Sequence, residues 1–454
     1  MPKTSPALCG CTKAWASGCS IEMRCIGSHW SRIAGMKDNK PPLLTRPLLI
    51  FMGTMILANI AGRMHEALLP LYIQSLGANI GQVGLFFTLG AVAPLAFQIL
   101  GGWLSDSLGR WQAVAIGSIA GVAGYVVFIV APTWQWLLLA MATGAMARAF
   151  VGPSYQAFIA EQSTEETRGR VYGLADGLFM VVGVIGPPVG GYLSEHYGFK
   201  EMFVAAGALY TFATVIRLFM ARSARRAAAA TTDSRGKPSL AGLKNSLVAL
   251  AGLITAGGIV TWIMIADGSY DVTFRLALEL QPLYMHNIAS LTNSQIGWLA
   301  SISSATMMLF IMPGGWLSDK WGERVGLVGG FLLLAIGMGI FLVSRTFVGF
   351  AAAWFMFGFG DALITPAHNA LISKAVPHKL RGTAFGFFAT SLGLVSLPAP
   401  YIGALMWERF GPQAPFFVPI AAALILMPIM WVKFKFPKAD AETQSITKAA
   451  VPEA

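Results

Sequence analysis

Long apolar runs separated by short polar turns make up most of this sequence. Each run has about 20 residues, the length that an α-helix needs to cross the hydrocarbon core of a bilayer. The pattern therefore predicts an all-α membrane protein. It indicates twelve transmembrane helices, near residues 47–73, 80–103, 111–131, 134–159, 170–194, 200–220, 259–285, 293–317, 325–344, 347–372, 383–407 and 414–434.

One polar stretch occurs twice. The segment GGWLSDSLGR at residues 101–110 returns as GGWLSDKWGER at residues 314–324, with Asp106 and Asp319 separated by 213 positions (319 − 106). Arg168 and Arg381 share that offset (381 − 168), whereas Arg63 and Arg275 are 212 apart (275 − 63). Parallel repeats of six helices are a common way for transporters to place a binding site between two halves. We expect two pseudo-symmetric six-helix bundles.

The turns and tails divide the chain into five parts. We predict a cytoplasmic N-terminal tail over 1–46, a first bundle over 47–220, a basic cytoplasmic linker over 221–246, a second bundle over 247–436 and a C-terminal tail over 437–454. All four cysteines lie in the N-terminal tail without a partner histidine or acidic cluster, so no metal site is predicted there.

Composition supports the membrane interpretation. Hydrophobic residues make up 55% of the chain and charged residues 12%, about half the charged share of a soluble domain. The net charge of +11 would fit a nucleic-acid-binding protein, but the basic residues gather in tails and loops on one side. This is the positive-inside pattern, which predicts that both termini are cytoplasmic. We expect a multi-pass protein of the plasma (inner) membrane, monomeric in the lipid bilayer, with no nucleic-acid partner.

The duplicated loop carries a family resemblance. Its pattern, Gly-x-Leu-Ser-Asp-x-x-Gly-Arg, resembles the signature loop of the major facilitator superfamily. The resemblance implies an alternating-access transporter in which this loop latches the two halves on the cytoplasmic side. The residues concerned are Gly102, Asp106, Gly109, Arg110, Gly315, Asp319, Gly322 and Arg324. The alternative is a capped turn without a gating role.

The fifth predicted helix holds a second motif. Its residues Gly186, Pro187, Gly190 and Gly191 resemble the Gly-Pro-x-x-Gly-Gly motif of the drug/proton antiporter branch, although Val182 stands where that motif has a glycine. Small residues three or four positions apart let helices approach closely. Close packing alone, with no bearing on the direction of transport, is the competing interpretation.

Charges inside predicted spans are the strongest functional signal, since each costs about 2.5–3.5 kcal/mol at a helix centre. Asp267, Asp271, Arg275 and Glu279 follow one another at intervals of four in the seventh span, so they lie on one stripe. Arg63 and Glu66 lie in the first span. We predict that Arg63, Glu66, Asp271, Arg275 and Glu279 contact the substrate. Alternatively, each arginine forms a structural ion pair, Arg63 with Glu66 and Arg275 with Asp271.

A further set of charges is predicted to couple transport to protons. Arg148 begins an Arg-x-x-x-Gly pattern that resembles the fourth-helix motif of the antiporter branch, and its repeat counterpart is Asp361 (361 − 148 = 213). Asp176 lies in the fifth span. A carboxylate that alternates between apolar and cationic surroundings can take up and release a proton. We name Arg148, Asp176 and Asp361 as coupling residues, with Glu66 as a further proton carrier.

Catalytic motifs are missing from the sequence: it has no phosphate-binding glycine loop with lysine, no paired metal-ligand motif and no nucleophile elbow. We therefore expect a transporter without catalytic residues or a cofactor, exporting drug-like or amphipathic compounds in exchange for protons. Two alternatives remain open. One is an organic-anion transporter or exchanger that uses Arg63 and Arg275, and the other is a membrane sensor that does not transport.

Overall fold

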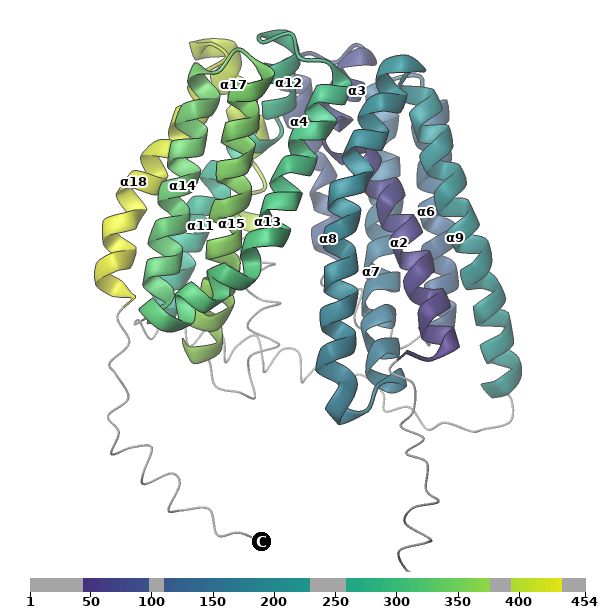
Figure 1. Ribbon diagram of the computed structural model, residues 1–454. Helices are drawn as coiled ribbons and strands as arrows, with labels where there is room; N and C mark the ends of the chain where they lie inside the picture. The colour runs from purple at the N-terminus through teal and green to yellow at the C-terminus, as the bar shows by residue number, and fades with distance from the viewer. Residues whose placement is uncertain (1–43, 98–109, 229–258, 376–392, 435–454) are drawn as a thin grey trace, which may run out of the picture. The chain divides into compact units, whose positions relative to one another are not determined.

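The computed structural model describes residues 44–97, 110–228, 259–375 and 393–434, and all regular structure within them is helical (Figure 1). From residue 46 on, these residues belong to one compact unit, Arg46–Ala454. In the first half the helices are α2 Arg46–Glu66, α3 Leu69–Ser75, α4 Ile80–Gly90, α6 Arg110–Val130, the 3₁₀ turn η1 Trp134–Trp136, α7 Leu137–Gln162, α8 Glu165–His196 and α9 Phe199–Ala228. In the second half they are α11 Ile259–Leu278, α12 Gln281–Asn287, α13 Asn293–Trp321, α14 Glu323–Val343, α15 Phe347–Ala375, α17 Ala399–Phe410 and α18 Ala414–Lys433.

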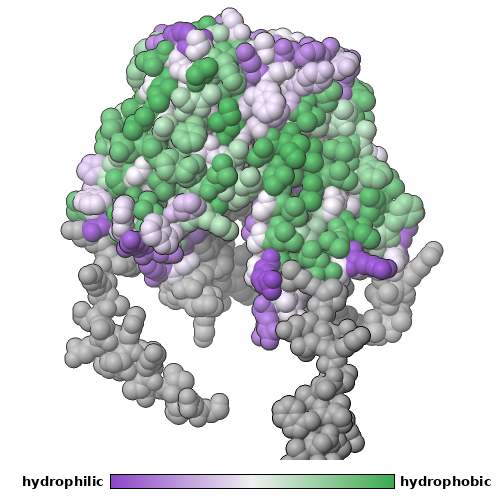
Figure 2. All heavy atoms as spheres, viewed as in Figure 1, coloured by the Kyte–Doolittle hydropathy of each residue, from purple (hydrophilic) through white to green (hydrophobic). Residues whose placement is uncertain are grey.

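Within the described residues, ten helices are long and apolar enough to cross a membrane. The face of the molecule seen in Figure 2 is mostly hydrophobic over its middle, with hydrophilic residues gathered toward its ends. Large apolar side chains such as Leu309, Met312 and Val343 are exposed. A soluble protein would not expose so much apolar surface, so this is an integral, multi-pass membrane protein.

Two predicted spans are broken. The first is divided into α2 and α3, and the seventh into α11 and α12. The cause is a pair of prolines, Pro70 and Pro282, related by the 212 offset (282 − 70). Proline has no N–H to donate to the carbonyl four residues earlier and its ring clashes with that carbonyl, so α2 ends at Glu66 and α11 ends at Leu278. Each proline instead occupies the first turn of the following helix, where its N–H is not needed.

Successive long helices run in opposite directions, which separates the connections into two sets. We call "turn end" the end formed by residues 76–79, 131–136, 197–198, 288–292, 344–346 and 411–413, where α3, α12 and α17 lie in Figure 1. We call "basic end" the opposite end, where α2 starts and α18 stops, and which carries Arg110, Lys320, Arg324, Lys374 and Lys433.

The halves meet mainly along two helix pairs, α8 with α13 and α4 with α17. Glycine permits both approaches. A Cβ at Gly84 would overlap the Pro400 carbonyl oxygen, and a Cβ at Gly297 would overlap the Pro187 carbonyl oxygen. Gly84 and Gly297 are 213 residues apart, as are Pro187 and Pro400 (297 − 84; 400 − 187). One contact is therefore built twice, once by each repeat.

Hydrogen bonds between the halves follow the same symmetry. The Glu408 carboxylate accepts from the Gly81 N–H at 2.8 Å, and the Glu195 carboxylate accepts from the Ser294 N–H at 2.8 Å. Both donors lie in the first turn of a helix, α4 or α13, where unpaired N–H groups and the helix dipole favour a negative charge. Glu195 and Glu408 differ by 213, and so do Gly81 and Ser294 (408 − 195; 294 − 81). We call these two bonds the carboxylate latches.

Further hydrogen bonds also join the halves. Asn287 donates to the Gln74 side chain at 3.2 Å, the Tyr401 N–H donates to the Thr88 hydroxyl at 3.2 Å, and the Ser301 hydroxyl donates to the Val184 carbonyl. Thr88 and Ser301 are again 213 apart (301 − 88). With the latches, these bonds hold the halves together on the side of the turn end.

Candidate functional site

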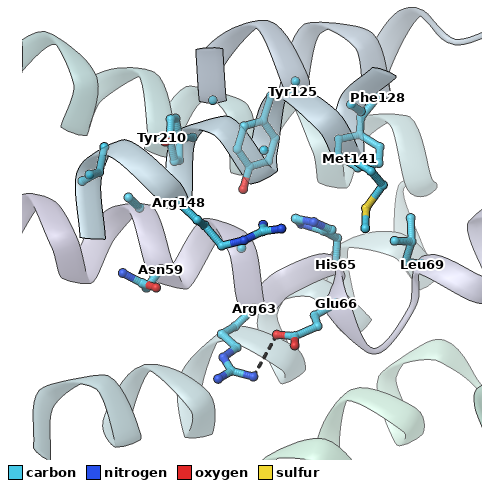
Figure 3. A pocket seen from close by; sticks show the side chains of 18 of the residues that line it. Asn59, Arg63, His65, Glu66, Leu69, Tyr125, Phe128, Met141, Arg148 and Tyr210 are labelled. Carbon is cyan, nitrogen blue, oxygen red and sulfur yellow. Dashed lines mark hydrogen bonds and ion pairs between the residues drawn. The ribbon is translucent and has the colours of Figure 1, made fainter. Parts of the chain in front are cut away.

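A cavity of about 590 Å³ lies inside the first half. Helices α2, α6, α7 and α9 supply most of its wall, and the broken α11–α12 segment adds a single residue, Glu279. The cavity combines an apolar surface with several charged groups. Apolar lining residues include Leu69, Phe87, Phe128, Met141 and Phe179, and polar ones include Asn59, Arg63, His65, Glu66, Tyr125, Arg148, Tyr210, Arg217 and Glu279 (Figure 3).

Arg63 and Glu66, both on α2, form an ion pair at the edge of this cavity. The Arg63 Nη1 to Glu66 Oε2 distance is 2.8 Å, and the side chains are 52% and 64% exposed. Glu66 is also the last residue of α2, directly before the break that Pro70 causes. The pair is thus open to the cavity.

His65 and Arg148 face each other across the cavity. In Figure 3 the Arg148 side chain extends from α7 toward the His65 ring and ends below the Tyr125 ring. His65 packs against Phe128 and Phe203, with ring centroids 5.3 Å away in both cases, and its Nδ1 lies 3.2 Å from the Ala61 carbonyl oxygen. Arg148 is exposed to the cavity, and among the ion pairs of the described residues none includes it.

Arg217 of α9 is a charged residue that the sequence analysis missed. Its side chain is buried, with 1% exposed, and its hydrogen bonds go to neutral groups. Nε donates to the Thr54 hydroxyl at 3.1 Å, Nη2 donates to the Thr54 carbonyl at 3.0 Å and to the Met55 sulfur at 3.1 Å, and Nη1 donates to the Ser118 hydroxyl at 3.4 Å. A single arginine in the sixth apolar run was a visible signal, by the same criterion that selected Arg148.

Glu279 is the contribution of the second half to this cavity. It lies in the two-residue gap between α11 and α12, where the chain leaves the helix because of Pro282. Glu279 interacts electrostatically with Glu66 and with Arg275. The Glu279 carboxylate of the second half therefore lies near the Glu66 carboxylate of the first half. Within the described part of the chain, Glu279 forms no ion pair of its own. The sequence placed Glu279 on a helical stripe, whereas the structure has it in a helix break.

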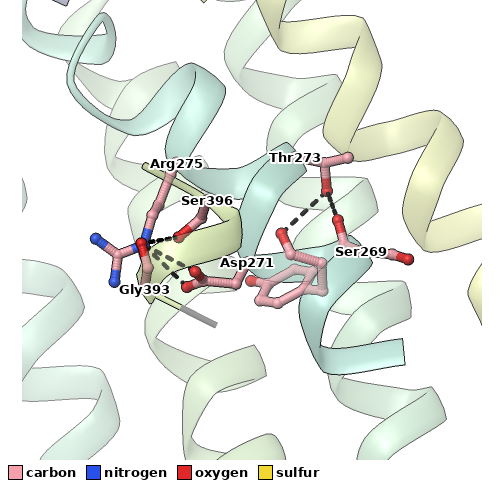
Figure 4. Close-up of polar contacts among 7 residues, drawn as sticks. Ser269, Asp271, Thr273, Arg275, Gly393 and Ser396 are labelled. Atoms are coloured by element: carbon pink, nitrogen blue, oxygen red, sulfur yellow. Dashed lines mark hydrogen bonds and ion pairs between the residues drawn. The ribbon is translucent and has the colours of Figure 1, made fainter. Parts of the chain in front are cut away.

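Arg275 pairs along its own helix. Its Nε lies 2.9 Å from Asp271 Oδ2 and 3.0 Å from Asp271 Oδ1, as Figure 4 shows. Neither residue lines the cavity that holds Arg63. The two arginines that the repeat relates are thus each bound to a carboxylate about one turn away, and the structure does not bring them into one pocket.

Two predicted proton carriers, Asp176 and Asp361, lie outside this cavity. Asp176 is exposed on α8, and its charge acts on Tyr155. Asp361 is half-buried on α15, and its charge acts on Tyr270. Neither lines the cavity. Among the residues that the structure describes, no three His, Cys, Asp or Glu side chains gather closely enough to hold a metal ion.

The second copy of the duplicated loop lies at the basic end. Gly322 ends α13 with φ at 95°, a backbone conformation that favours glycine. Gly315 lies against Pro366, Asp319 is in the last turn of α13, and the Arg324 guanidinium lies 4.9 Å from the centre of the Trp431 ring. In the first copy, Gly102, Asp106 and Gly109 lie outside the described residues, and Arg110 pairs with Glu161.

The glycines of α8 pack against backbone. Gly186 lies against Arg63, and a Cβ at Gly190 would overlap the Met64 carbonyl of α2. A Cβ at Gly191 would come 2.6 Å from the Asn293 carbonyl oxygen of the other half. Pro187 also contacts the other half, through its carbonyl beside Gly297. This motif therefore lies where α8 touches both α2 and α13.

A comparison with protein families decides the assignment. The sequence profile of the Major Facilitator Superfamily matches residues 51–285 and again residues 269–452. The chain belongs to the Major Facilitator Superfamily. The first match covers the first half and continues to residue 285, and the second covers most of the second half. The twelve-helix fold of two bundles that the sequence predicted is the fold of this superfamily.

Superfamily members with similar sequences include named efflux pumps. The chain is 27% identical over 383 residues to the "Multi-drug resistance efflux pump PmrA homolog" of Lactococcus lactis, covering 82% of this chain and 90% of that relative. It is 24% identical over 415 residues to the "Multidrug resistance protein MdtG" of Dickeya zeae, covering 88% of this chain and 97% of that relative.

Solved structures share the fold. A peptide transporter POT in complex with sulfate superposes with a TM-score of 0.65 at 15% identity, over 85% of this chain and 93% of that one. A D-xylose-proton symporter gives a TM-score of 0.65 at 12% identity, over 87% of this chain and 98% of that one. These likenesses concern the superfamily fold and carry no information on the substrate.

Proposed function

We propose that this protein is a secondary active transporter that exports drug-like or amphipathic compounds in exchange for protons. The names of its relatives PmrA and MdtG support efflux, and the cavity supports an amphipathic substrate because it joins an apolar wall to charged groups. We further propose that it works as a monomer in the plasma (inner) membrane, with both termini and the basic end in the cytoplasm. It needs no cofactor and no catalytic residue for this function.

The observation that carries the proposal is the position of Glu279. This carboxylate belongs to the second half, lines the cavity of the first half and has no ion-pair partner within the described residues. A carboxylate in a partly apolar cavity beside another carboxylate, Glu66, is stabilised when one of the two is protonated. Glu66 and Glu279 together are thus the proton-binding groups we favour.

Proton binding at Glu66 would also release Arg63. The Arg63–Glu66 pair depends on an ionised carboxylate, so a proton on Glu66 removes the ion pair and leaves the Arg63 guanidinium free to bind a substrate group. Substrate and proton then act on the same side chains. We also keep three further residues as proposed coupling residues, namely Arg148, Asp176 and Asp361. Replacing each of them separates its contribution to proton coupling from that of Glu279.

Alternating access requires the two ends to open in turn. The hydrogen bonds between the halves near the turn end correspond to a state that is closed on the outer side of the membrane, because the basic end is the cytoplasmic one in our orientation. In the opposite state we propose that the duplicated loops, with Asp106 and Arg110 or Asp319 and Arg324, latch the basic end. The bundles 47–220 and 247–436 would then move as bodies joined by the linker 221–246.

The organic-anion exchanger based on Arg63 and Arg275 is not favoured, because each arginine pairs with its own neighbour and Arg275 lies outside the cavity. The names of the relatives do not favour a sensor without transport either.

The test is ethidium uptake into inverted membrane vesicles that contain the protein. Uptake should need an acidic vesicle interior and stop when a protonophore is added. The variant E279Q should lose proton-driven uptake yet still exchange ethidium down its own gradient. The control is E201Q, which removes an exposed carboxylate of α9 outside the cavity, while D361N and D176N test the other two proposed coupling carboxylates. Uptake that is indifferent to the protonophore would refute proton coupling.

A further inference from the structure

The wall of the cavity formed by α7 and α9 carries two arginines and no carboxylate. Arg148 of α7 is exposed to the cavity, and Arg217 of α9 is buried beside it. The charges of both act on the Tyr210 hydroxyl, and that of Arg148 also acts on Tyr125. The two guanidinium groups and the two tyrosines therefore share one small region of the cavity.

Arg217 brings an unbalanced charge into this wall. Its guanidinium donates to two hydroxyls, a carbonyl and a sulfur, none of which is negative, and it also interacts with the Tyr210 hydroxyl. Neutral acceptors satisfy its hydrogen bonds but do not cancel its charge, and a buried charge without an opposite one is costly. Tyr210 lies so tightly against Gly121 of α6 that a Cβ at this glycine would overlap the tyrosine ring. The packing against α6 therefore fixes the position of Tyr210.

The carboxylates of the cavity do not neutralise the positive charges of the two arginines in this wall. Glu66 is bound to Arg63 at 2.8 Å, and in Figure 3 the dashed line joins these two while Arg148 extends away toward His65. Glu279 comes from the other half and forms no ion pair with either arginine of the wall. Of the three arginines and two glutamates that line the cavity, one arginine and one glutamate neutralise each other, which leaves two cations against one carboxylate.

We propose that this wall, together with Tyr125 of α6, binds the carboxylate head of amphipathic organic acids, with Arg148 and the hydroxyls of Tyr125 and Tyr210 as the contacting groups. The apolar body of such an acid would lie against Phe128 and Met141, which line the same cavity. Guanidinium groups and tyrosine hydroxyls are suitable donors for a carboxylate. Arg217 is a positioning residue: it acts through Tyr210 and adds positive charge behind it.

This inference rests on the proposed function in one respect, because it takes the cavity as the substrate pocket. It differs from the anion exchanger considered above, which required Arg275. It predicts that the exporter binds amphipathic molecules that carry a carboxylate, including zwitterions, more tightly than cations such as ethidium, which remain weaker substrates. Cationic compounds of equal size and apolarity should bind less well.

The test compares three probes with one ring system: tritiated 1-naphthylacetate, its neutral amide and the cation 1-naphthylethylamine. Equilibrium binding to the full-length protein in detergent, without any gradient, is measured by scintillation proximity. The unlabelled amide and amine should compete at least about tenfold less well than unlabelled acid, the loss expected for one charge-assisted hydrogen bond. R148Q should lose a similar factor for the acid alone, R148K should recover part of it, and R217Q should narrow the difference between acid and amide.

The control is R222Q, which removes an exposed arginine at the end of α9 outside the cavity. The inference is overturned if naphthylacetate shows no saturable binding, if the amide competes as well as the acid, or if R148Q binds like R222Q. Should R148Q fail to fold, competition on the unaltered protein decides by itself. Binding is measured without a gradient, so a failure of proton coupling would not affect the measured preference for the acid over the amide. Conversely, proton-driven ethidium uptake by a protein that does not prefer the acid would refute only the carboxylate-binding inference.

Discussion

The two carboxylate latches allow a quantitative prediction about the conformational equilibrium. Each joins a glutamate of one half to the first turn of a helix in the other, at 2.8 Å. A hydrogen bond to a charged group contributes about 1.5–3 kcal/mol, but both glutamates are exposed, so we take about 1 kcal/mol for each. The latches share no residue, so their contributions should add to about 2 kcal/mol.

Replacing both glutamates, as E195A with E408A, removes the acceptor of each bond and should therefore shift the equilibrium roughly 30-fold toward a state open at the turn end. A state populated at about 1% would rise to roughly a quarter of the molecules. Each single variant should shift the equilibrium about fivefold, and by similar amounts, because the repeat makes the two bonds equivalent.

The assay is double electron–electron resonance between spin labels at Thr133 and Val348, which are exposed at the turn end in opposite halves. The labels are attached in a background from which the four native cysteines have been removed. A longer-distance population should appear in the double variant. The control E201A removes a carboxylate from the first turn of α9, which packs on α2, α6 and α8 of its own half. Unchanged distances in the double variant, or an equal change in E201A, would refute the reasoning.

Three further predictions concern packing and charge. G190A should lower the free energy of unfolding by about 1–3 kcal/mol, because the added Cβ meets the backbone of α2. G173A, on the same helix with open space around it, should be neutral or slightly stabilising. Thermal unfolding in detergent measures both variants. T54V should cost about 1.5–3 kcal/mol in the same assay, since it removes an acceptor from buried Arg217. R63Q should change the unfolding free energy by less than about 1 kcal/mol because its ion pair is half-exposed, while the dependence of ethidium uptake on pH changes.

Several features of the site could be read from local sequence. Proline removes an N–H wherever it stands, so the breaks before Pro70 and Pro282 were available from the sequence, although the sequence analysis treated both spans as continuous. The pairing of Arg275 with Asp271 follows from their spacing of four on one helix, and it was named as an alternative. Arg217 shows the limit of this reasoning, because its partners on α2 and α6 are distant in sequence.

The sequence by itself determined the membrane-spanning helices, their duplication and the superfamily, because hydrophobic length and a repeated motif are local properties of the chain. Only the tertiary structure decided which charges meet. A charge within a span has to face another helix or a cavity, but the rotation and depth of each helix depend on packing against its neighbours. For that reason Glu279 joins the cavity of the other half, Arg275 does not, and each latch pairs a glutamate with a helix start about 100 or 300 residues away.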